Sequence, residues 1–464
     1  MKDILENIKL LKKYHTDLVY DYTEYPTKSH WEESFDYNSY KDCLSEWLPK
    51  NTKKPFLFYV HTPFCEQLCY FCLCSKEITQ NYERVKEYLY NYQLKEIDLL
   101  TEHLNNINVP LNVKEIYFGG GSPTYYKEKE FKVLVNKIKN IIDFNNIDDF
   151  TVEIDPRRVD EERLLFYSSM GVNRISFGIQ DFDPLVQEEI NRIQPPELVS
   201  KLLTNNVRKA FPAINFDLLI GLPAQTVSSI KNTIKSVVDL KPTQLQTMYM
   251  HYKPQTRKYM IKMLRNRSLP DFYDRKAIFA EASEDLISAG YTRAGFESYS
   301  LPDDVLTDAM ENKKAYYASL GTQKGEAINF IAVGSSAHGC LEDEYYFQNY
   351  YEQNLYRDAI KENKFPIYRG LKLNKDDKIR QKLVKDVRTY FKIDFKEYNI
   401  MFDIDFDKYF AKEINNLKAF ENDGLLIIQS DKITLSDLGV HFSPQVANVF
   451  DNYNDQMLYK KKIA

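Results

Sequence analysis

Residues 58–75 read Phe-Tyr-Val-His-Thr-Pro-Phe-Cys-Glu-Gln-Leu-Cys-Tyr-Phe-Cys-Leu-Cys-Ser, and this stretch decides the fold. Four of the six cysteines of the chain lie in it, at Cys65, Cys69, Cys72 and Cys74. The apolar and β-branched residues 56–60 predict a buried parallel strand, so the cysteines follow its carboxyl end. Sheets of α/β proteins place their functional sites at this end of the strands.

The cysteines do not suit the two commonest uses of clustered thiols, a disulfide and a zinc site. Cys65, Cys69 and Cys72 offer three thiolates, and no second Cys/His pair follows at zinc-ribbon spacing. Zinc sites usually have four ligands. Thiolate-rich loops also hold iron–sulfur clusters, usually through four cysteines. A loop with three cysteines would leave one iron open to bind and activate another molecule.

The spacing Cys65-x-x-x-Cys69-x-x-Cys72, with an aromatic residue before the last cysteine, resembles the cluster loop of the radical S-adenosylmethionine (SAM) superfamily. Two longer strings are similar to the oxygen-independent coproporphyrinogen III oxidases and their HemN-like relatives. They are Tyr-Val-His-x-Pro-Phe-Cys at 59–65 and Leu-Cys-Tyr-Phe-Cys-x-Cys at 68–74. By this resemblance the chain is identified as a HemN-like member of the superfamily.

The resemblance implies that Cys65, Cys69 and Cys72 hold a [4Fe–4S] cluster and form the catalytic centre. The iron without a thiolate would bind SAM, and one electron would break a C–S bond to give a 5′-deoxyadenosyl radical. That electron requires a donor such as flavodoxin or ferredoxin. Cys74 is not expected to be a ligand, because a fourth thiolate would occupy the iron that SAM needs. Its family counterpart lies near a second SAM.

The same resemblance implies cofactor contacts further along the chain. Gly119-Gly120-Gly121-Ser122 resembles the SAM-binding glycine motif, and successive glycines let a backbone approach a ligand closely. Glu153 matches a SAM-contacting glutamate, Gln180, Arg192 and Asp217 match the second SAM site, and the backbones around His251 and His338 are expected to flank the adenosine of the first SAM. The expected cofactor-binding residues are Tyr59, Phe71, Cys74, Gly120, Gly121, Ser122, Glu153, Gln180, Arg192, Asp217, His251 and His338.

The composition favours a globular protein over a membrane protein or a nucleic-acid-binding protein. The chain of 464 residues fits one large α/β domain with an appendage, and 43% hydrophobic and 28% charged residues are typical of globular proteins. No apolar run approaches the roughly 20 residues of a membrane helix, and the N-terminus lacks a signal peptide's apolar stretch. A net charge of −5 with scattered Lys and Arg argues against nucleic acid binding. We expect a cytoplasmic monomer that acts on a small molecule.

Strand-like runs alternate with helical patterns from residue 51, which is the signature of βα units and a parallel sheet. The predicted helices between the strands include 82–105 and 127–142. The predicted strands are 56–60, 115–118, 150–154, 174–178, 214–220 and 245–250. Six such units predict a partial (β/α)6 barrel of the TIM type, which is the fold of the superfamily.

Two further domains are expected, an N-terminal extension at 1–50 and a C-terminal domain at 370–464, with the barrel at 51–369. The extension begins with apolar residues at helical spacing, and its Tyr-Thr-x-Tyr-Pro-Thr string at 22–27 resembles one that lies near the active site of HemN-type enzymes. The C-terminal domain reads as helices and then two short strands within 424–435, a winged-helix-like pattern. Its helices are not basic, which favours a cover for the barrel over DNA binding.

Three functions stay open. Two strings of the oxidases, His-x-Asn-Phe-Gln-Gly-Tyr-Thr-Thr and Asp-His-Phe-Ala, are replaced by residues 317–325 and 297–300, whereas the second SAM site is kept. This combination favours a HemN-like enzyme that uses the second SAM as methyl or methylene donor to an sp2 carbon. The tyrosine string at 22–27 and the pattern at 369–380 favour the alternative, an oxygen-independent coproporphyrinogen III oxidase of haem biosynthesis. Residues 334–338 resemble the third, a non-catalytic haem chaperone.

Overall fold

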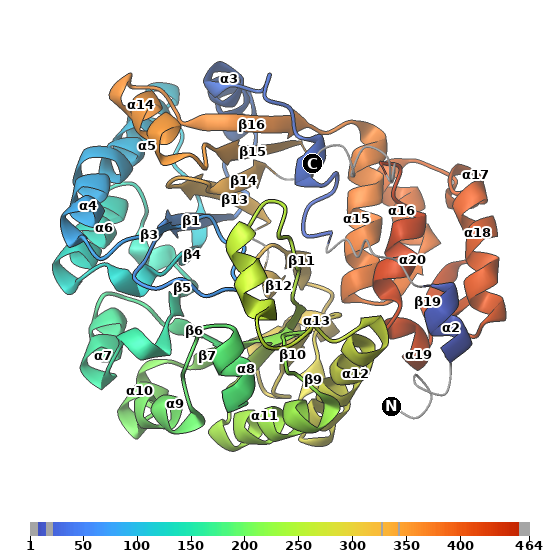
Figure 1. Cartoon of the computed structure of the whole chain (residues 1–464). Coiled ribbons are helices and arrows are strands. Elements are labelled where there is room, and N and C mark those ends of the chain that lie inside the picture. The colour runs from blue at the N-terminus through green and yellow to red at the C-terminus, as the bar shows by residue number, and fades with distance from the viewer. Residues whose placement is uncertain (1–7, 15–21, 326–327, 342–343, 454–464) are drawn as a thin grey trace.

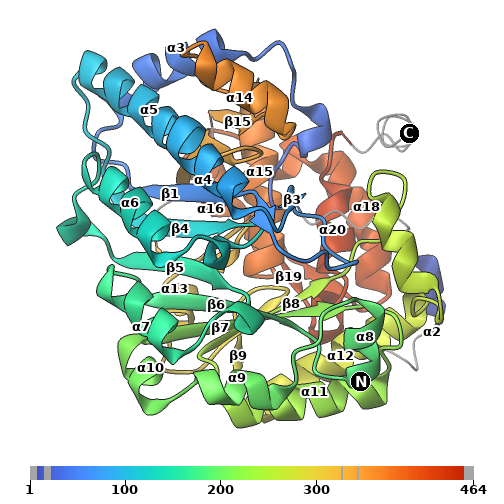
Figure 2. The same cartoon turned by 60° about the vertical axis from the view of Figure 1, so that its left-hand side comes forward.

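The computed structural model describes residues 8–14, 22–325, 328–341 and 344–453. Its main body is a curved twelve-stranded sheet with the strand order β16-β15-β14-β13-β1-β4-β5-β6-β7-β8-β10-β9. The seven strands from β13 to β8 run parallel, and the strands beyond them on both sides are antiparallel. Helices cover the outer side of the arc, and the C-terminal helices lie against its other side (Figures 1 and 2).

The strands have the following bounds. The parallel strands are β1 (Phe56–Thr62), β4 (Val113–Gly120), β5 (Asp149–Ile154), β6 (Arg174–Gln180), β7 (Ala213–Ile220), β8 (Gln244–Tyr249) and β13 (Asn329–Val333). The antiparallel strands are β9 (Thr292–Arg293), β10 (Ser298–Ser300), β14 (His338–Leu341), β15 (Tyr345–Asn349) and β16 (Ile367–Lys372). Two short ladders lie apart from this sheet, β2 (Phe64–Cys65) with β3 (Glu77–Ile78), and β11 (Tyr316–Ala318) with β12 (Gly321–Gln323).

All six predicted strands and the partial parallel barrel are confirmed, whereas the seventh parallel strand, β13, was not predicted. Predicted helix 82–105 is α4 (Tyr82–Tyr88), a π-helical turn (Leu89–Gln93) and α5 (Leu94–Ile107), and predicted helix 127–142 is α6 (Glu128–Lys139). The remaining barrel helices are α7 (Glu161–Ser169), α8 (Pro184–Glu189), α9 (Pro196–Leu202), α10 (Asn205–Ala210), α11 (Val227–Leu240), α12 (Phe272–Ser288), α13 (Val305–Glu311) and α14 (Gln353–Lys361).

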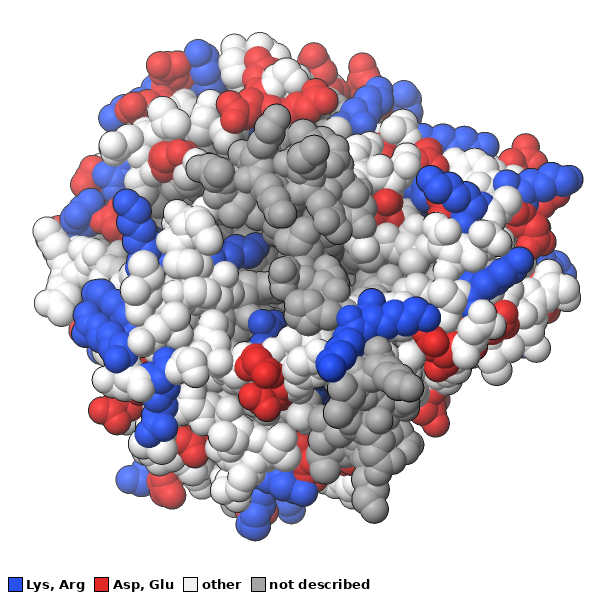
Figure 3. All heavy atoms as spheres, turned by 45° about the vertical axis from the view of Figure 1, so that its right-hand side comes forward, with Lys and Arg blue, Asp and Glu red and all other residues white. Residues whose placement is uncertain are grey.

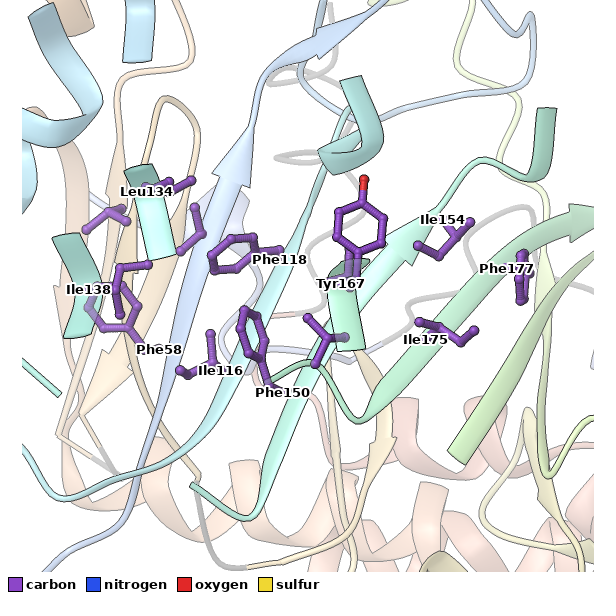
Figure 4. Packing of buried hydrophobic residues seen from close by; sticks show 14 of the residues in the cluster. Phe58, Ile116, Phe118, Leu134, Ile138, Phe150, Ile154, Tyr167, Ile175 and Phe177 are labelled. Atoms are coloured by element: carbon purple, nitrogen blue, oxygen red, sulfur yellow. The ribbon is translucent and has the colours of Figure 1, made fainter. Parts of the chain in front are cut away.

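Apolar side chains of the strands and helices form one continuous core. The parallel strands are covered on both faces, which explains why their sequences are nearly continuous apolar runs. Phe118 and Phe150 on neighbouring strands pack with ring centroids 5.0 Å apart (Figure 4). Phe131 on α6 packs on Tyr167 of α7, with ring centroids 4.7 Å apart. This packing fixes the strands, and with them the loops at their carboxyl ends.

The C-terminal domain has its own buried core. Its helices are α15 (Lys375–Thr389), α16 (Phe395–Phe402), α17 (Phe406–Tyr409), α18 (Ala411–Asn422), α19 (Asp437–Val440) and α20 (Ser443–Val449). Asn374 and Asp377 form a reciprocal capping box that starts α15. The predicted strands are β18 (Leu426–Ile428) and β19 (Lys432–Leu435), and β19 also pairs with the unpredicted β17 (Lys392–Asp394). The predicted border between 369 and 370 falls inside β16, so the division into domains stays a prediction.

The N-terminal strip, residues 22–27, lies between the barrel and the C-terminal domain. The hydroxyl of Tyr22 donates to Asn448 Oδ1 at 2.8 Å, and the backbone amide of Asn452 donates to the hydroxyl of Tyr25 at 3.0 Å. Of the predicted N-terminal helix, α2 (Ile8–Lys13) belongs to the described residues, and Ile4 lies outside them. Helix α3 (Tyr37–Trp47) packs on the barrel through residues that include Leu44.

The surface shown in Figure 3 carries acidic and basic side chains next to one another. Among the described residues, there is no helix with the length and apolar character needed to span a bilayer.

Glu96 on α5 is a buried carboxyl group behind the sheet. It accepts hydrogen bonds from the Gly334 amide at 2.7 Å, Asn349 Nδ2 at 2.6 Å and the Tyr356 hydroxyl at 2.6 Å. Burial raises the pKa of Glu96 to about 7. The folded protein therefore keeps a proton that the unfolded chain releases above about pH 4.3, so stability falls as the pH rises through this window.

The raised pKa of Glu96 predicts how the stability of the variant Glu96→Gln depends on pH. In the unchanged protein the raised pKa lowers the free energy of unfolding by about 2 kcal/mol between about pH 5 and about pH 7. The variant cannot release a proton here, so we expect it to lack this part of the pH dependence. Urea unfolding at the two pH values measures it, and a variant with an unaltered pH dependence would contradict the assignment.

Candidate active site

A pocket of about 450 Å³ opens at the carboxyl ends of the parallel strands. It is lined by the cysteine loop, the glycine loop after β4, the ends of β5 to β8, and residues near β10, β11 and β12. Every predicted site residue lines it except Tyr59 and His338. Pockets of this volume commonly hold cofactors and other small molecules.

Strand pairing at its base and hydrogen bonds near its end hold the cysteine loop in place. Parallel pairing of β2 with β3 closes the base, because Cys65 lies opposite Ile78. Near the end of the loop the Cys72 carbonyl accepts hydrogen bonds from Lys76 Nζ at 3.1 Å and from the Tyr259 hydroxyl. Lys76 and Tyr259 were not predicted, since they lie outside the cysteine motif. The loop is therefore held in one conformation by groups far apart in the sequence.

Cys69 lies against two guanidinium groups. Arg157 Nη2 is 3.7 Å and Arg192 Nη1 is 3.6 Å from its sulfur. Asp155 contacts both arginines, at 2.7 Å from Arg157 and 3.5 Å from Arg192. Although burial opposes ionisation, the two arginines lower the pKa of Asp155 to about 2. Neighbouring cations favour the thiolate form of a cysteine, which is the form that binds metal. Arg157 was not predicted, because its contact with Cys69 joins two loops that are far apart in the sequence.

The other thiols differ in charge state. A hydrogen bond from the Cys74 thiol, together with the Lys76 ammonium, lowers the pKa of Cys72, and the same hydrogen bond raises that of Cys74. Burial raises the pKa of Cys65 to about 12. No group of three or more His, Cys, Asp or Glu side chains in the described ranges is arranged to hold a single metal ion. Three thiols that line one pocket from one loop are a donor set that fits an iron–sulfur cluster.

Arg192 has a buried N–H group that is available to donate a hydrogen bond to a ligand. Its Nη2 donates to the Gly178 carbonyl at 2.7 Å, but its Nε is buried and lacks a hydrogen-bond partner among the described residues. A Cβ atom on Gly178 would lie 2.8 Å from Gln180 Nε2, so the absence of a side chain on Gly178 makes room for the Gln180 side chain. Asp217, whose pKa is raised by burial, accepts hydrogen bonds from Ser176 and Asn215 at 2.8 Å. The three residues predicted for a second SAM thus converge on one side of the pocket.

The glycine loop is packed too closely for larger residues. A Cβ atom on Gly119 would lie 2.8 Å from Glu153 Oε1, and one on Gly121 would lie 2.8 Å from the Phe64 carbonyl. The Gly120 amide donates to Glu153 Oε2 at 3.1 Å. Burial, and then Asp217, raises the pKa of Glu153 to about 8. A cationic ligand in the pocket would lower that pKa and gain a carboxylate partner.

The two segments that replace oxidase strings form one wall of the pocket. Glu297, before β10, and Tyr317, on β11, both line it. The Tyr317 hydroxyl donates to Glu297 Oε2 at 3.1 Å, and Arg388 of α15 lies 3.4 Å from the same oxygen and 3.2 Å from the Tyr317 hydroxyl. The C-terminal domain therefore supports the pocket through a buried guanidinium.

Tyr59 and His338 are predicted site residues that do not line the pocket. The Tyr59 hydroxyl contacts His61 Nδ1 at 3.2 Å, beside the sheet. His338 Nε2 contacts Glu24 Oε1 at 3.0 Å and Ser319 Oγ at 3.1 Å, in a neighbouring small cavity. Burial lowers the pKa of His338. Its side chain contacts the N-terminal strip, and the expectation that the backbone around His338 flanks the adenosine of the first SAM stays a prediction.

Comparison with known proteins identifies families and relatives that this chain resembles. Residues 59–237 match the model of the radical SAM superfamily, and residues 373–442 match that of the HemN C-terminal domain. An oxygen-independent coproporphyrinogen III oxidase from Synechocystis is 30% identical over 96% of this chain and 94% of the relative, and one from Pseudomonas aeruginosa is 30% identical over 93% of each. The chain belongs to this family.

The solved structure of the coproporphyrinogen III oxidase HemN from Escherichia coli, described as a radical SAM enzyme, agrees with this membership. It matches with a TM-score of 0.86 and 27% identity, over 96% of this chain and 99% of that one. The chain is thus a HemN-type radical SAM enzyme, and the predicted fold, the [4Fe–4S] cluster and SAM are confirmed. The roles of individual site residues stay predictions.

Proposed function

We propose that this enzyme decarboxylates propionate side chains of coproporphyrinogen III to vinyl groups without oxygen. The observation that carries the proposal is the extent of the relationship. The oxidases from Synechocystis and Pseudomonas match along 93% or more of both chains, including the C-terminal domain that supports the pocket wall. Each propionate would lose a hydrogen atom and then carbon dioxide, and the remaining electron would pass to an external acceptor.

The chain's own residues would prepare the site for this reaction. When bound, the reduced cluster and SAM supply a 5′-deoxyadenosyl radical that removes a hydrogen atom from the substrate. Cys65, Cys69 and Cys72 would hold the cluster, and Arg157 and Arg192 would stabilise the thiolate of Cys69. The walls of the pocket would orient the reacting atoms.

Cationic residues suit an anionic substrate. Arg158 lies in the pocket wall next to Arg157, and it also pairs with Glu66 at 2.7 Å at the pocket edge. Guanidinium groups bind carboxylates through paired hydrogen bonds, which is what a substrate with propionate side chains requires. Acidic side chains, among them Glu153, Asp217 and Glu297, line the same pocket, so an anionic substrate would be bound by individual arginines and not by a net positive charge.

The methyl or methylene transfer favoured by the sequence has no support among these relatives, which are named oxidases. The replaced strings at 297–300 and 317–325 do line the pocket, so they are expected to alter how the substrate is held. A haem chaperone is the remaining alternative, and the family relationship to enzymes does not favour it.

One anaerobic assay separates the three functions. The reconstituted enzyme is given coproporphyrinogen III, dithionite, an electron acceptor and SAM labelled in its methyl group. We expect carbon dioxide, a vinyl-containing product without label, and 5′-deoxyadenosine, none of which form when SAM is left out. Label in the product would instead show methyl transfer. Haem binding without any cleavage of SAM would show a chaperone.

A further inference from the structure

The segment that follows β8, residues 252–270, is strongly basic. It contains six Lys and Arg residues and no Asp or Glu, in a chain whose net charge is −5. The six are Lys253, Arg257, Lys258, Lys262, Arg265 and Arg267. The expectation that Lys and Arg are scattered along the chain is therefore wrong for this basic segment. In Figure 1 the yellow-green chain after β8 passes in front of the barrel.

The basic segment is attached to the cysteine loop. The Tyr259 hydroxyl donates to the Cys72 carbonyl, and Arg257 Nη2 donates to the Leu73 carbonyl at 3.4 Å. Met260 and Met263, on the 3-10 helix Lys258–Leu264, are buried in a cluster that also includes Phe71. The segment thus covers the outer side of the loop whose thiols would hold the cluster.

Four of the six charged side chains of this segment lie outside the pocket. Lys258, Lys262, Arg265 and Arg267 are exposed, and none of them lines the pocket. Ile261 lies among them with 57% of its surface exposed, and Leu185 on the contacting helix α8 is 50% exposed. An apolar centre inside a charged rim is the usual anatomy of a protein interface. Because these side chains do not face the pocket, they are suited to a partner outside it, not to the substrate.

We propose that the basic segment is the docking surface for a small acidic electron-transfer protein of the flavodoxin or ferredoxin kind. The inference rests on the proposed function, because a radical SAM enzyme needs one electron from an external donor, which is thereby oxidised. A positive patch beside the cluster loop would attract an acidic donor and orient it there. The overall negative charge of the chain would disfavour docking elsewhere.

The test is the charge reversal Lys258→Glu/Arg265→Glu, made at two exposed residues of the basic segment. Lys412→Glu/Lys418→Glu on α18, also exposed, is the matched control with the same change in net charge. Each reconstituted enzyme is titrated with a purified acidic flavodoxin and with an acidic [2Fe–2S] ferredoxin, and Kd is measured at low and high salt. Formation of 5′-deoxyadenosine is then followed with each reduced protein and, separately, with dithionite.

We expect the first variant to bind the accepted donor at least about tenfold more weakly at low salt and to lose the donor-driven rate by a similar factor. The dithionite-driven rate and the control variant should be unchanged. Unaltered donor binding in the first variant, or an equal loss in the control, would overturn the docking surface. Failure of the unchanged enzyme to cleave SAM with dithionite would instead overturn the proposed function, and the binding titration would still decide the docking surface.

Discussion

Replacing Cys69 by Ala should abolish SAM cleavage, with a loss of activity of more than about a thousandfold. Two cysteines cannot hold a cluster whose usual ligation is three or four thiolates. Cys69 is the thiol that the guanidinium groups of Arg157 and Arg192 approach, so the variant also leaves these cations without their sulfur partner. Iron content after anaerobic reconstitution and the yield of 5′-deoxyadenosine with dithionite measure the loss.

Two other cysteines provide controls for this result. Cys340 lies outside the motif, where its thiol donates to the Ile328 carbonyl at 3.1 Å, so Cys340→Ala should keep both iron and activity. Cys74→Ala should keep its iron, because Cys74 is not expected to be a ligand. If Cys69→Ala bound iron as well as the unchanged protein, or if Cys74→Ala lost it, the assignment of the three ligands would be wrong.

Arg388→Ala should lower the free energy of unfolding by about 3–5 kcal/mol, the usual loss when one partner of a buried ion pair is removed. Arg388 is fully buried, and its guanidinium lies 3.4 Å from Glu297 Oε2 and over the ring of Phe296. The variant leaves the Glu297 carboxylate buried without this cation. Because Glu297 lines the pocket, substrate turnover should fall as well.

Urea unfolding of the anaerobic protein measures this loss. Lys385→Ala, three residues earlier on α15 and half-buried, is the control, and we expect it to change stability by less than about 1 kcal/mol. The double variant Arg388→Met/Glu297→Gln removes both charges and should recover much of the lost stability. A single variant as stable as the unchanged protein would show that the pair does not join the two domains.

The parallel strands could be predicted because each is a local run of buried apolar residues. Strand β13 (Asn329–Val333) was missed although its residues are also buried and mostly apolar, because the helices and short strands between β8 and β13 interrupt the regular βα alternation. The antiparallel strands β14 to β16 extend the sheet from β13. Short strands that depend on distant partners carry little local signal.

The site residues differ in the same way: some could be predicted from a local pattern, and others depend on contacts between distant segments. Motif residues such as Cys69 and Glu153 could be placed from their spacing and from the ends of predicted strands. Arg157, Lys76 and Tyr259 act through contacts with the cysteine loop that no local pattern shows. His338 was grouped with the cofactor residues by the family resemblance, and its contact with Glu24 could not be predicted because it depends on how the N-terminal strip folds back.

The anchoring of the N-terminal strip has a consequence for how the enzyme matures. Thr23 of the strip lines the pocket, while its neighbours Tyr22 and Tyr25 contact residues 448–452, more than 400 positions further along the chain. That side of the cavity can therefore be completed only after residues 448–452 have been synthesised. The pocket wall thus depends on a contact that cannot form while the barrel is still emerging from the ribosome.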